Sequence, residues 1–280
     1  ARQCRANKPH CGLFSRHYNS QNTCHGNGGL CLFNQRQLAI IDMLQTQDKV
    51  SVTELTDALG VSLVTVRQDL KKLEERGVLK RTHGGAVPVV SGYDISTRMW
   101  NHYEAKLRIA QAAASLVSDG ETVIVETGST CSLLARELAA KRGVTIITNS
   151  VFLANFVRDC PSLDIVLLGG SFQHDAETNV GPLTKLCLSQ FSVDKCFIGA
   201  DAVSAEMGVT AINLFRAEVA RYMAHSARKM IVLTTSDKVG GSSTTTIFPL
   251  STLHTLITDD ALPQRQEQLL TAAGVHVIKA

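Results

Sequence analysis

The sequence predicts an α/β protein in which a small N-terminal winged helix-turn-helix precedes a larger domain with a mainly parallel sheet. Two observations support this prediction. Short helical patterns and a basic hairpin fill residues 34–90, whereas apolar β-type runs alternate with helical stretches over residues 107–280. Hydrophobic residues make up 44% and charged residues 19% of the 280-residue chain, so each domain has enough apolar material for a core.

Residues 1–33 differ in composition from the rest of the chain. They are rich in Asn, Gly, His and Cys, contain no acidic residue and show no hydrophobic period. We expect a disordered tail, or an extension that does not belong to the native protein. Cys11, Cys24, His25 and Cys31 are possible zinc ligands, but their spacing does not match the C-x2-C type of zinc site. We therefore predict no metal, and no motif indicates a cofactor.

The formal net charge of +3 comes from this tail. Arg2, Arg5, Lys8 and Arg16 give it +4, which leaves 3 − 4 = −1 for the other residues. Net charge is thus no evidence for a nucleic-acid partner, and the placement of basic residues has to supply it. No apolar run reaches the roughly 18 residues that span a bilayer, and the chain does not start with a secretory signal. We expect a cytoplasmic protein with no membrane partner.

The first domain is predicted from helix starts and stops. A helix begins at about Asn34, because apolar residues recur on one face as far as Leu44. Ser51-Val52-Thr53-Glu54 has the capping-box pattern that starts a second helix. Gly60-Val61-Ser62 ends that helix, since Gly adopts the positive φ of a tight turn and Ser can cap a third helix over about 63–76.

A hairpin and a linker complete the first half of the chain. Residues 78–83 predict a strand, Gly84-Gly85 a turn and residues 86–88 a return strand. Apart from Met99 and Trp100, the residues that follow have little apolar patterning. We therefore predict a winged helix-turn-helix over 34–90, a linker over 91–106 and a second domain over 107–280.

The second domain alternates helical and β-type patterns. After a helical pattern at 107–117, apolar runs lie at 122–125, 144–148, 165–168, 195–198, 230–233 and 255–258, with a last short one at 276–278. Such runs, mostly separated by helical stretches, are typical of a largely parallel sheet that helices cover on both faces.

The helix, turn, helix and basic hairpin of the first domain form an assembly typical of DNA-binding proteins, whose second helix lies in the major groove. Residues 62–85 contain six Lys and Arg and three acidic residues, which gives a local charge of +3. The candidate base-reading residues are Ser62, Thr65, Arg67 and Gln68, and the candidates for phosphate or hairpin contacts are Lys71, Lys72, Lys80, Arg81 and His83.

Other interpretations of this region stay open. The helix pair can simply be solvated, or the winged helix can bind protein instead of DNA. Arg67 can equally form an internal salt bridge with Asp69 or Glu74.

Polar loops follow several predicted strands of the second domain. Gly128-Ser129-Thr130 opens a helix, where amides, hydroxyls and the helix dipole suit an anion such as phosphate, although Ser and Thr are also ordinary N-caps. Because ligands of parallel sheets lie at the carboxyl ends of strands, we expect these loops to line one crevice. The candidate effector-binding residues are Gly128, Ser129, Thr130, Asn149, Ser150, Gly170, Asp201, Arg216 and Lys238. Lys238 would supply charge to a phosphate, and Asp201 and Asn149 would hold sugar hydroxyls.

Two sequence strings resemble the signature of the DeoR family of bacterial regulators. They are the S-x-x-T-V-R-x-D-L pattern from Ser62 to Leu70, followed by Leu73-Glu74, and the R-T-H-G-G-A string from Arg81 to Ala86. The resemblance covers about 34–280. It implies a repressor of carbon-source genes that a sugar phosphate releases from operator DNA. It also implies that the second domain is similar in fold to ribose-5-phosphate isomerase and glucosamine-6-phosphate deaminase.

The chain departs from the family pattern at three positions. Glu126 replaces the usual Asp before Gly-Ser-Thr, Arg216 stands where an acidic residue usually precedes Ala, and Thr235 replaces a common Asp. These departures bear on the identity of the effector. Arg216 either adds charge to the pocket and favours a more anionic ligand, or points to solvent.

The rival hypothesis is a sugar-phosphate isomerase-like enzyme, which needs a positioned carboxylate base and a group that polarises the carbonyl. The acids available near loops are Glu126, Asp175, Asp201 and Glu218, with His174 adjacent to one of them. No pattern pairs them as acid and base, so we predict that the protein is not an enzyme. Since one winged helix rarely gives enough specificity, we also expect a homo-oligomer.

Overall fold

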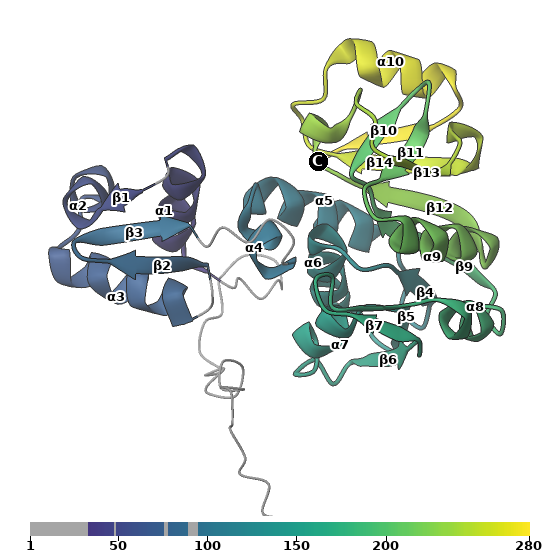
Figure 1. The fold of residues 1–280 in the computed structure, drawn as a ribbon, viewed down its shortest axis with the longest axis horizontal. Helices are drawn as coiled ribbons and strands as arrows, with labels where there is room; N and C mark the ends of the chain where they lie inside the picture. Colours follow the sequence, from purple (N-terminus) through teal and green to yellow (C-terminus); the bar gives the residue numbers. More distant parts are fainter. Residues whose placement is uncertain (1–32, 48, 76–77, 89–94) are drawn as a thin grey trace, which may run out of the picture.

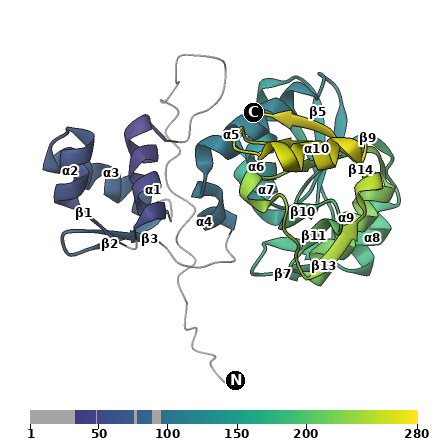
Figure 2. The same cartoon turned by 90° about the horizontal axis from the view of Figure 1, so that it is seen from above.

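The computed structural model describes residues 33–47, 49–75, 78–88 and 95–280. Figure 1 shows a small helical unit with a hairpin, a larger α/β unit, and the short helix α4 (Ile95–Trp100) between them. The view from above in Figure 2 shows the same arrangement. In the described part of the chain, no helix is long and apolar enough to cross a membrane.

The small unit is a winged helix-turn-helix. Its elements are α1 (Gln35–Thr46), β1 (Val50–Ser51), α2 (Val52–Leu59), α3 (Leu63–Glu75), β2 (Leu79–Thr82) and β3 (Gly85–Pro88). The predicted capping box is present: the amide of Glu54 donates to Ser51 Oγ over 3.1 Å, and the amide of Ser51 donates to Glu54 Oε2 over 2.7 Å. Gly60 ends α2 at φ 62°, as predicted for the turn.

The hairpin is joined to the helices by a close backbone approach. The three strands form an antiparallel sheet in the order β1-β3-β2, and β1 leads directly into α2. A Cβ atom at Gly85 would collide with the backbone oxygen of Val50. Only glycine therefore fits at this crossing, and the hairpin is held against the N-terminus of α2.

The stretch predicted as a linker contains helical structure. Helix α4 lies within residues 91–106, and α5 (Tyr103–Ser115) begins there as well. Ile95 and Met99 are buried, so α4 packs as part of the fold. Sequence patterning missed α4 because six residues are too few to show a helical period.

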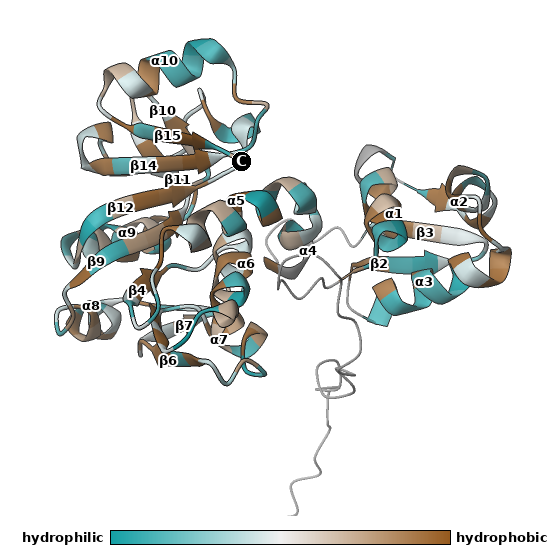
Figure 3. Ribbon diagram, turned by 180° about the vertical axis from the view of Figure 1, so that it is seen from behind, coloured by the Kyte–Doolittle hydropathy of each residue, from teal (hydrophilic) through white to brown (hydrophobic). Residues whose placement is uncertain are grey.

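The large unit contains a seven-stranded sheet in the order β15-β14-β12-β9-β4-β5-β6, and every neighbouring pair is parallel. Its strands are β4 (Thr122–Val125), β5 (Val144–Thr148), β6 (Leu163–Leu167), β9 (Val193–Gly199), β12 (Ala227–Leu233), β14 (Leu253–Thr258) and β15 (His276–Lys279). Each matches a predicted apolar run, which confirms the parallel sheet. In Figure 3 much of this sheet is brown, as expected for strands covered on both faces.

Two buried clusters cover the two faces of the sheet. Val123 and Val125 belong to one cluster and Ile124 to the other, as alternation along a strand requires. The first cluster includes side chains of α5, α6 (Ser129–Glu137) and α7 (Val151–Phe156). The second includes side chains of α8 (Pro182–Leu188), α9 (Leu214–His225) and α10 (Gln264–Ala272).

Two small antiparallel sheets and three short 3-10 turns complete the unit. The first sheet has the order β10-β11-β13 and the second is the hairpin β7-β8. Their strands are β7 (Ser171–Gln173), β8 (Thr178–Val180), β10 (Ala202–Ser204), β11 (Gly208–Ala211) and β13 (Thr245–Phe248), and the turns are η1 (Leu138–Ala140), η2 (Ser236–Lys238) and η3 (Leu250–Thr252). The sequence did not predict these strands, because each is only three or four residues long.

The strand order reverses at β4. The chain passes from β4 to β5 and β6 in one direction, then returns to β9 on the other side of β4. The loops after β4 and β9 therefore separate at the carboxyl edge of the sheet, and such a switch point is where ligands bind in open α/β sheets. Gly128 and Asp201 lie on the two loops that separate at this switch point.

Candidate functional site

The N-terminus of α3 is capped as the sequence predicted. The amide of Thr65 donates to Ser62 Oγ over 3.2 Å, and the two hydroxyl oxygens lie 2.9 Å apart. These contacts fix the first turn of the helix. Ser62 is exposed and Thr65 is half-buried, so both stay at the surface next to the first turn.

The outward face of α3 is polar and open to solvent. Its inner face is formed by the buried residues Val66, Asp69, Leu70 and Leu73, whereas the outer face presents Arg67, Gln68, Lys71 and Lys72. Leu63 and Val64 are also exposed at the start of the helix. The helix is therefore free to enter a groove, the condition on which the DNA-binding interpretation depends.

The acidic residues of this region all have cationic partners. Asp69 accepts from Arg36 Nε and, over 3.1 Å, from Gln37 Nε2, which ties α3 to α1. Glu74 accepts from Arg81 Nε over 2.6 Å and from its amide over 2.9 Å. Neither acid is a partner of Arg67, so the predicted alternative of an internal salt bridge does not hold.

The ion pairs of the acidic residues determine which cations remain available to contact DNA phosphates. Arg81 was predicted to contact phosphate, but its pair with Glu74 ties the hairpin to α3 and neutralises its charge. Lys71 lies 3.9 Å from Glu75, a surface pair of small energetic value. Among the described residues, Arg67, Lys72 and Lys80 are exposed cations with no acidic partner.

A groove of about 430 Å³ separates α3 from the hairpin. Its lining residues are Val52, Arg67, Leu70, Glu74, Arg81, Thr82, His83, Gly84 and Gly85. Arg67 stands on one wall and His83 on the other. The structure therefore brings predicted residues from the helix and the hairpin onto one surface.

A second cavity lies at the switch point of the large sheet. Six predicted effector residues line it: Gly128, Ser129, Thr130, Asp201, Arg216 and Lys238. They come from the loop after β4, the loop after β9, helix α9 and the turn η2. Residues as far apart in the sequence as Gly128 and Lys238 thus meet at one edge of the sheet.

The helix that opens this cavity lacks a side-chain cap. Gly128 is the N-cap residue of α6, and in the described part of the chain this helix has no side-chain cap hydrogen bond. The prediction left open whether Ser129 and Thr130 only cap the helix, and the structure shows no such cap. The helix dipole and the first amides of α6 favour negative charge at this position.

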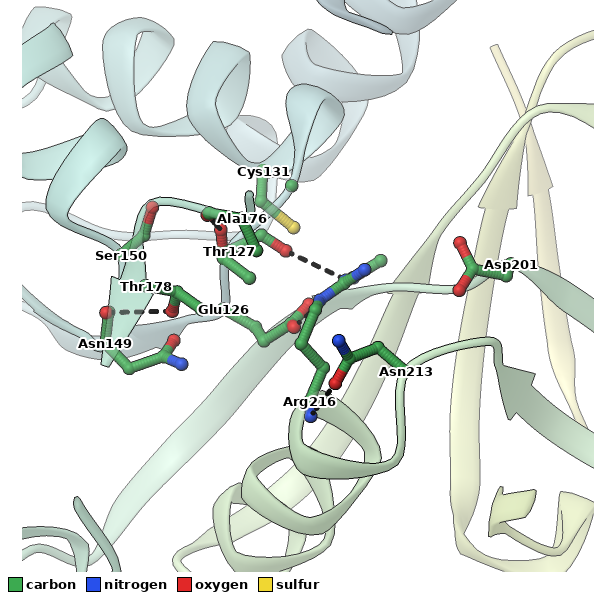
Figure 4. A network of polar contacts seen from close by, with 12 residues as sticks. Glu126, Thr127, Cys131, Asn149, Ser150, Ala176, Thr178, Asp201, Asn213 and Arg216 are labelled. Carbon is green, nitrogen blue, oxygen red and sulfur yellow. Dashed lines mark hydrogen bonds and ion pairs between the residues drawn. The ribbon is translucent and has the colours of Figure 1, made fainter. Parts of the chain in front are cut away.

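Arg216 and Glu126 form a buried pair at the back of the cavity. Arg216 Nη2 donates to Glu126 Oε1 over 3.2 Å, and the amide of Gly199 donates to Oε2 over 3.3 Å. Figure 4 shows the Arg216 side chain reaching from α9 toward Glu126 and Thr127. Two of the three departures from the family pattern are therefore one interaction, and the interpretation that Arg216 points to solvent is wrong.

The electrostatics of the pair follow from its burial. Desolvation raises the pKa of Glu126, an effect that Arg216 opposes. Burial alone would lower the pKa of Arg216, but Glu126 and Asp201 together raise it. Arg216 Nε is buried without a hydrogen-bond partner. The guanidinium thus keeps its charge and has an unused donor near the cavity.

Polar groups on the opposite wall are also held in place. Asp201 Oδ2 accepts from the amide of Ile212 over 2.8 Å. Asp259 accepts from the amide and the hydroxyl of Ser236, each over 2.7 Å, and so fixes the turn that carries Lys238. Thr234 lines the same cavity, and its buried hydroxyl has no partner. The cavity therefore offers unused hydrogen-bonding groups to a polar ligand.

Three predicted effector residues lie outside this cavity. Asn149 is fully buried and donates to the backbone oxygen of Asn179 over 3.0 Å, and Ser150 caps α7 by accepting from the amide of Leu153. At Gly170 a Cβ atom would collide with Thr184. All three hold the hairpin β7-β8 and its neighbours together. Asn149 and Ser150 follow β5 and Gly170 follows β6, whereas the loops that form the switch point follow β4 and β9.

Two cations of the cavity were missed by the sequence analysis. Arg98 from α4 and Lys106 from α5 line the cavity beside Lys238. Both fall in the stretch predicted as a linker. A pair of cations flanking Met99 and Trp100 was a possible signal, but the sequence does not show that this stretch folds back over the sheet.

The acids considered for catalysis do not converge. Glu126 is paired with Arg216, and Glu218 accepts from the hydroxyl of Tyr222 over 3.0 Å. His174 and Asp175 are exposed between β7 and β8. In the described part of the chain, no group of three metal-ligating side chains is present, and the possible zinc ligands of the tail lie outside the described residues.

Comparison with known proteins gives matches over both units. Residues 36–91 match the DeoR-like helix-turn-helix domain, and residues 101–260 match the DeoR C terminal sensor domain. The chain is 33% identical over 246 residues to the HTH-type transcriptional regulator GolR of Listeria innocua, covering 87% of this chain and 97% of that protein. It is 34% identical over 247 residues to the HTH-type transcriptional repressor GlcR of Bacillus subtilis, covering 87% and 95%.

The larger unit also has a match among solved structures. Ribose 5-phosphate isomerase A from Methanocaldococcus jannaschii aligns with 49% of this chain and 55% of its own, at 22% identity and a TM-score of 0.37. The two domain matches and the similarity over almost the whole length of GolR and GlcR decide the classification. The chain belongs to the DeoR family of transcriptional regulators, which is not a family of enzymes.

Proposed function

We propose that this protein is a cytoplasmic repressor of carbohydrate-metabolism genes whose hold on operator DNA is modulated by a phosphorylated sugar or related small anion. The observation that supports this most directly is the cavity at the switch point. Four cations line it, Arg98, Lys106, Arg216 and Lys238, and a single carboxylate, Asp201. An excess of buried positive charge beside an uncapped helix N-terminus suits a phosphate group.

Recognition of DNA is assigned to α3 and the hairpin. In this proposal Arg67 and Gln68 contact base edges in the major groove, because Arg suits guanine and Gln suits adenine. Lys72 and Lys80 contact phosphates, since they are exposed cations on α3 and on the hairpin strand β2. The exposed Leu63 and Val64 suit thymine methyl groups.

Repression is proposed from the relatives and from the coupling of two sites. GlcR is named a transcriptional repressor, and this chain matches 95% of its length. The effector is expected to favour an arrangement of the protein that no longer fits the operator, and its reach is limited by its differential affinity for the two arrangements.

A homo-oligomer is part of the proposal. Leu183 and Leu186 on α8, and Leu214 and Phe215 on α9, are each more than half exposed. The two helices pack against each other, so these apolar side chains lie on neighbouring elements. Exposed apolar surface of this kind is typical of association sites, and a symmetric dimer would present two recognition helices.

The DNA part is tested by a salt titration of binding to the promoter region of the protein's own gene. Operator binding should weaken steeply as salt rises, because phosphate contacts release counterions. Binding that salt leaves unchanged, or no binding at all, would favour a winged helix that interacts with protein.

The effector part is tested by thermal shift with a set of sugar phosphates. A ligand at 100 times its Kd should stabilise the protein by about 2.7 kcal/mol. Ser129→Ala and Lys238→Ala should lose the shift, whereas Lys229→Ala, an exposed lysine at the other end of β12, should keep it. A ligand that stabilises all the variants equally would bind elsewhere.

A further inference from the structure

The effector cavity is small in this structure. Its volume is about 30 Å³. A water molecule needs roughly 10–15 Å³, whereas pockets for small-molecule ligands measure about 300–1,000 Å³. A phosphorylated sugar therefore fits inside this cavity only if one of the walls moves.

The walls of the cavity differ in how firmly they are held. Gly128, Asp201 and Thr234 directly follow β4, β9 and β12, which pair with neighbours on both sides in the centre of the sheet. Another wall is formed by Arg98 on the six-residue helix α4 and Lys106 on α5. Lys106 Nζ donates to the backbone oxygen of Arg98, so this wall is joined by a hydrogen bond. Helix α4 is short and belongs to no sheet, so strand pairing does not hold this wall as it holds the wall formed by β4, β9 and β12.

Like charges meet at this wall. Burial lowers the pKa of Lys106 to about 7, and repulsion from Lys238 and Arg98 adds to that effect, against a smaller attraction from Asp237. Burial also lowers the pKa of Lys238, with Arg98 contributing in the same direction against Asp201. An anion placed among the three cations would replace this repulsion by attraction.

We propose that Arg98 and Lys106 bind the anionic group of the effector, so that helix α4 completes the site and is repositioned when the effector enters. This inference rests on the proposed function, because it concerns the same cavity. The unpartnered, buried hydroxyl of Thr234 and the uncapped N-terminus of α6 lie on the opposite wall, so an anion between them would touch both sides. Arg98 and Lys106 thus become ligands of the effector and not only residues of a linker.

The same helix contacts the DNA-reading unit. Trp100, the last residue of α4, lies with its ring centroid 4.5 Å from that of Phe33, in an edge-to-face arrangement of 74°. Tyr103 adds centroid distances of 5.5 Å to Trp100 and 6.3 Å to Phe33. Phe33 is buried and directly precedes Asn34, the N-cap of α1. In this proposal, a displacement of α4 therefore moves the start of α1, the first helix of the winged helix-turn-helix.

The chain contains one tryptophan, so its fluorescence reports on α4 alone. The experiment titrates the full-length protein with inorganic phosphate and with glucose 6-phosphate, using potassium chloride at equal ionic strength as the control. Tryptophan emission and the melting temperature are recorded together. We expect a saturable change in emission with at least one of the two phosphates and none with chloride.

Variants assign the change to the named residues. Arg98→Ala and Lys106→Met should weaken phosphate binding about tenfold or more, because each loses a charge-assisted contact. Arg98→Lys should recover part of the affinity. Arg108→Ala removes a cation from an exposed position on α5, outside the cavity, and should bind as the wild type does. Melting curves without ligand show whether each variant is folded.

A final variant tests transmission. Phe33→Leu should bind phosphate with unchanged affinity in the thermal-shift assay, while the ligand releases less operator DNA from it than from the wild type. If Arg98→Ala is folded and binds like the wild type, Arg98 is not a ligand and this inference fails while the proposed function stands. If phosphate raises the melting temperature of the wild type without changing tryptophan emission, α4 is not repositioned. If neither phosphate raises it, the proposed effector site fails as well.

Discussion

Lys106 makes the proposed effector site sensitive to pH in a way that can be calculated. With a pKa of about 7, its amine is about nine-tenths neutral at pH 8 in the free protein. A phosphate dianion beside it would restore a pKa near the ordinary value of 10.5. Binding at pH 8 should therefore take up about 0.9 proton, and the affinity should fall about tenfold between pH 8 and pH 9.

Isothermal calorimetry in buffers of different ionisation enthalpy measures this proton uptake directly. The phosphate itself contributes little above pH 7.5, because its second pKa is about 6. Lys238 also has a lowered pKa, so Lys238→Met separates its contribution. Lys106→Arg is the matched control, since an arginine keeps the charge and cannot lose its proton. Equal proton uptake by the wild type and Lys106→Arg would refute the reasoning.

The free energy of unfolding of the ligand-free protein should also depend on the protonation of Lys106. The folded-state pKa of Lys106 lies below the unfolded value, so the unfolded chain binds more protons between pH 7 and pH 10.5. The cost of burying the charge is complete below pH 7 and is relieved as the pH rises through that window. Between pH 7 and pH 9, the free energy of unfolding should rise by about 2 kcal/mol relative to Lys106→Met.

Three further predictions concern other parts of the molecule. Arg67→Ala should relax discrimination between operator variants, while Lys72→Ala should weaken binding to all of them alike and reduce the salt slope by about one; band-shift titrations at several salt concentrations would expose the opposite pattern. Glu126→Gln should destabilise the protein by about 3 kcal/mol in urea unfolding, because it leaves the buried Arg216 without its anion, and a loss below 1 kcal/mol would mean that Arg216 escapes to solvent. Phe215→Glu should shift the assembly toward smaller species in analytical ultracentrifugation, and an unchanged mass would show that this surface is not the interface.

The elements that form by local rules could be predicted from the sequence. The capping box from Ser51 to Glu54, the left-handed Gly60 and the apolar strands each depend on a few adjacent residues. Side-chain period and turn chemistry decide such elements. The parallel sheet followed from them, and so did the position of a site at the carboxyl ends of its strands.

The site itself was predicted only in part, for a physical reason. The sequence pointed to Gly128, Asp201 and Lys238 because each follows a strand. It also pointed to Asn149, which follows a strand as well but lies outside the cavity. The strand order decides which loops separate, and tertiary contacts set that order. Which side chains meet across 90 residues is set in the same way.

The pair between Glu126 and Arg216 is an example. Each residue alone departs from the family pattern, and only the fold shows that they are partners. Arg98 was missed because α4 is too short to show a helical period, and Lys106 was missed because it lies on α5 just before the predicted helical pattern.

The crossing at Gly85 limits how the protein can be switched. The hairpin packs against β1 so closely that no side chain fits between Gly85 and Val50, β3 pairs with β1, and Glu74 with Arg81 ties β2 to α3. We therefore expect the winged helix-turn-helix to move as one rigid unit, with the same surface whether it is bound to DNA or released. Under the proposed function, an incoming signal relocates or reorients this piece as a whole, and in the proposed homo-oligomer the control of transcription depends on the geometry between copies.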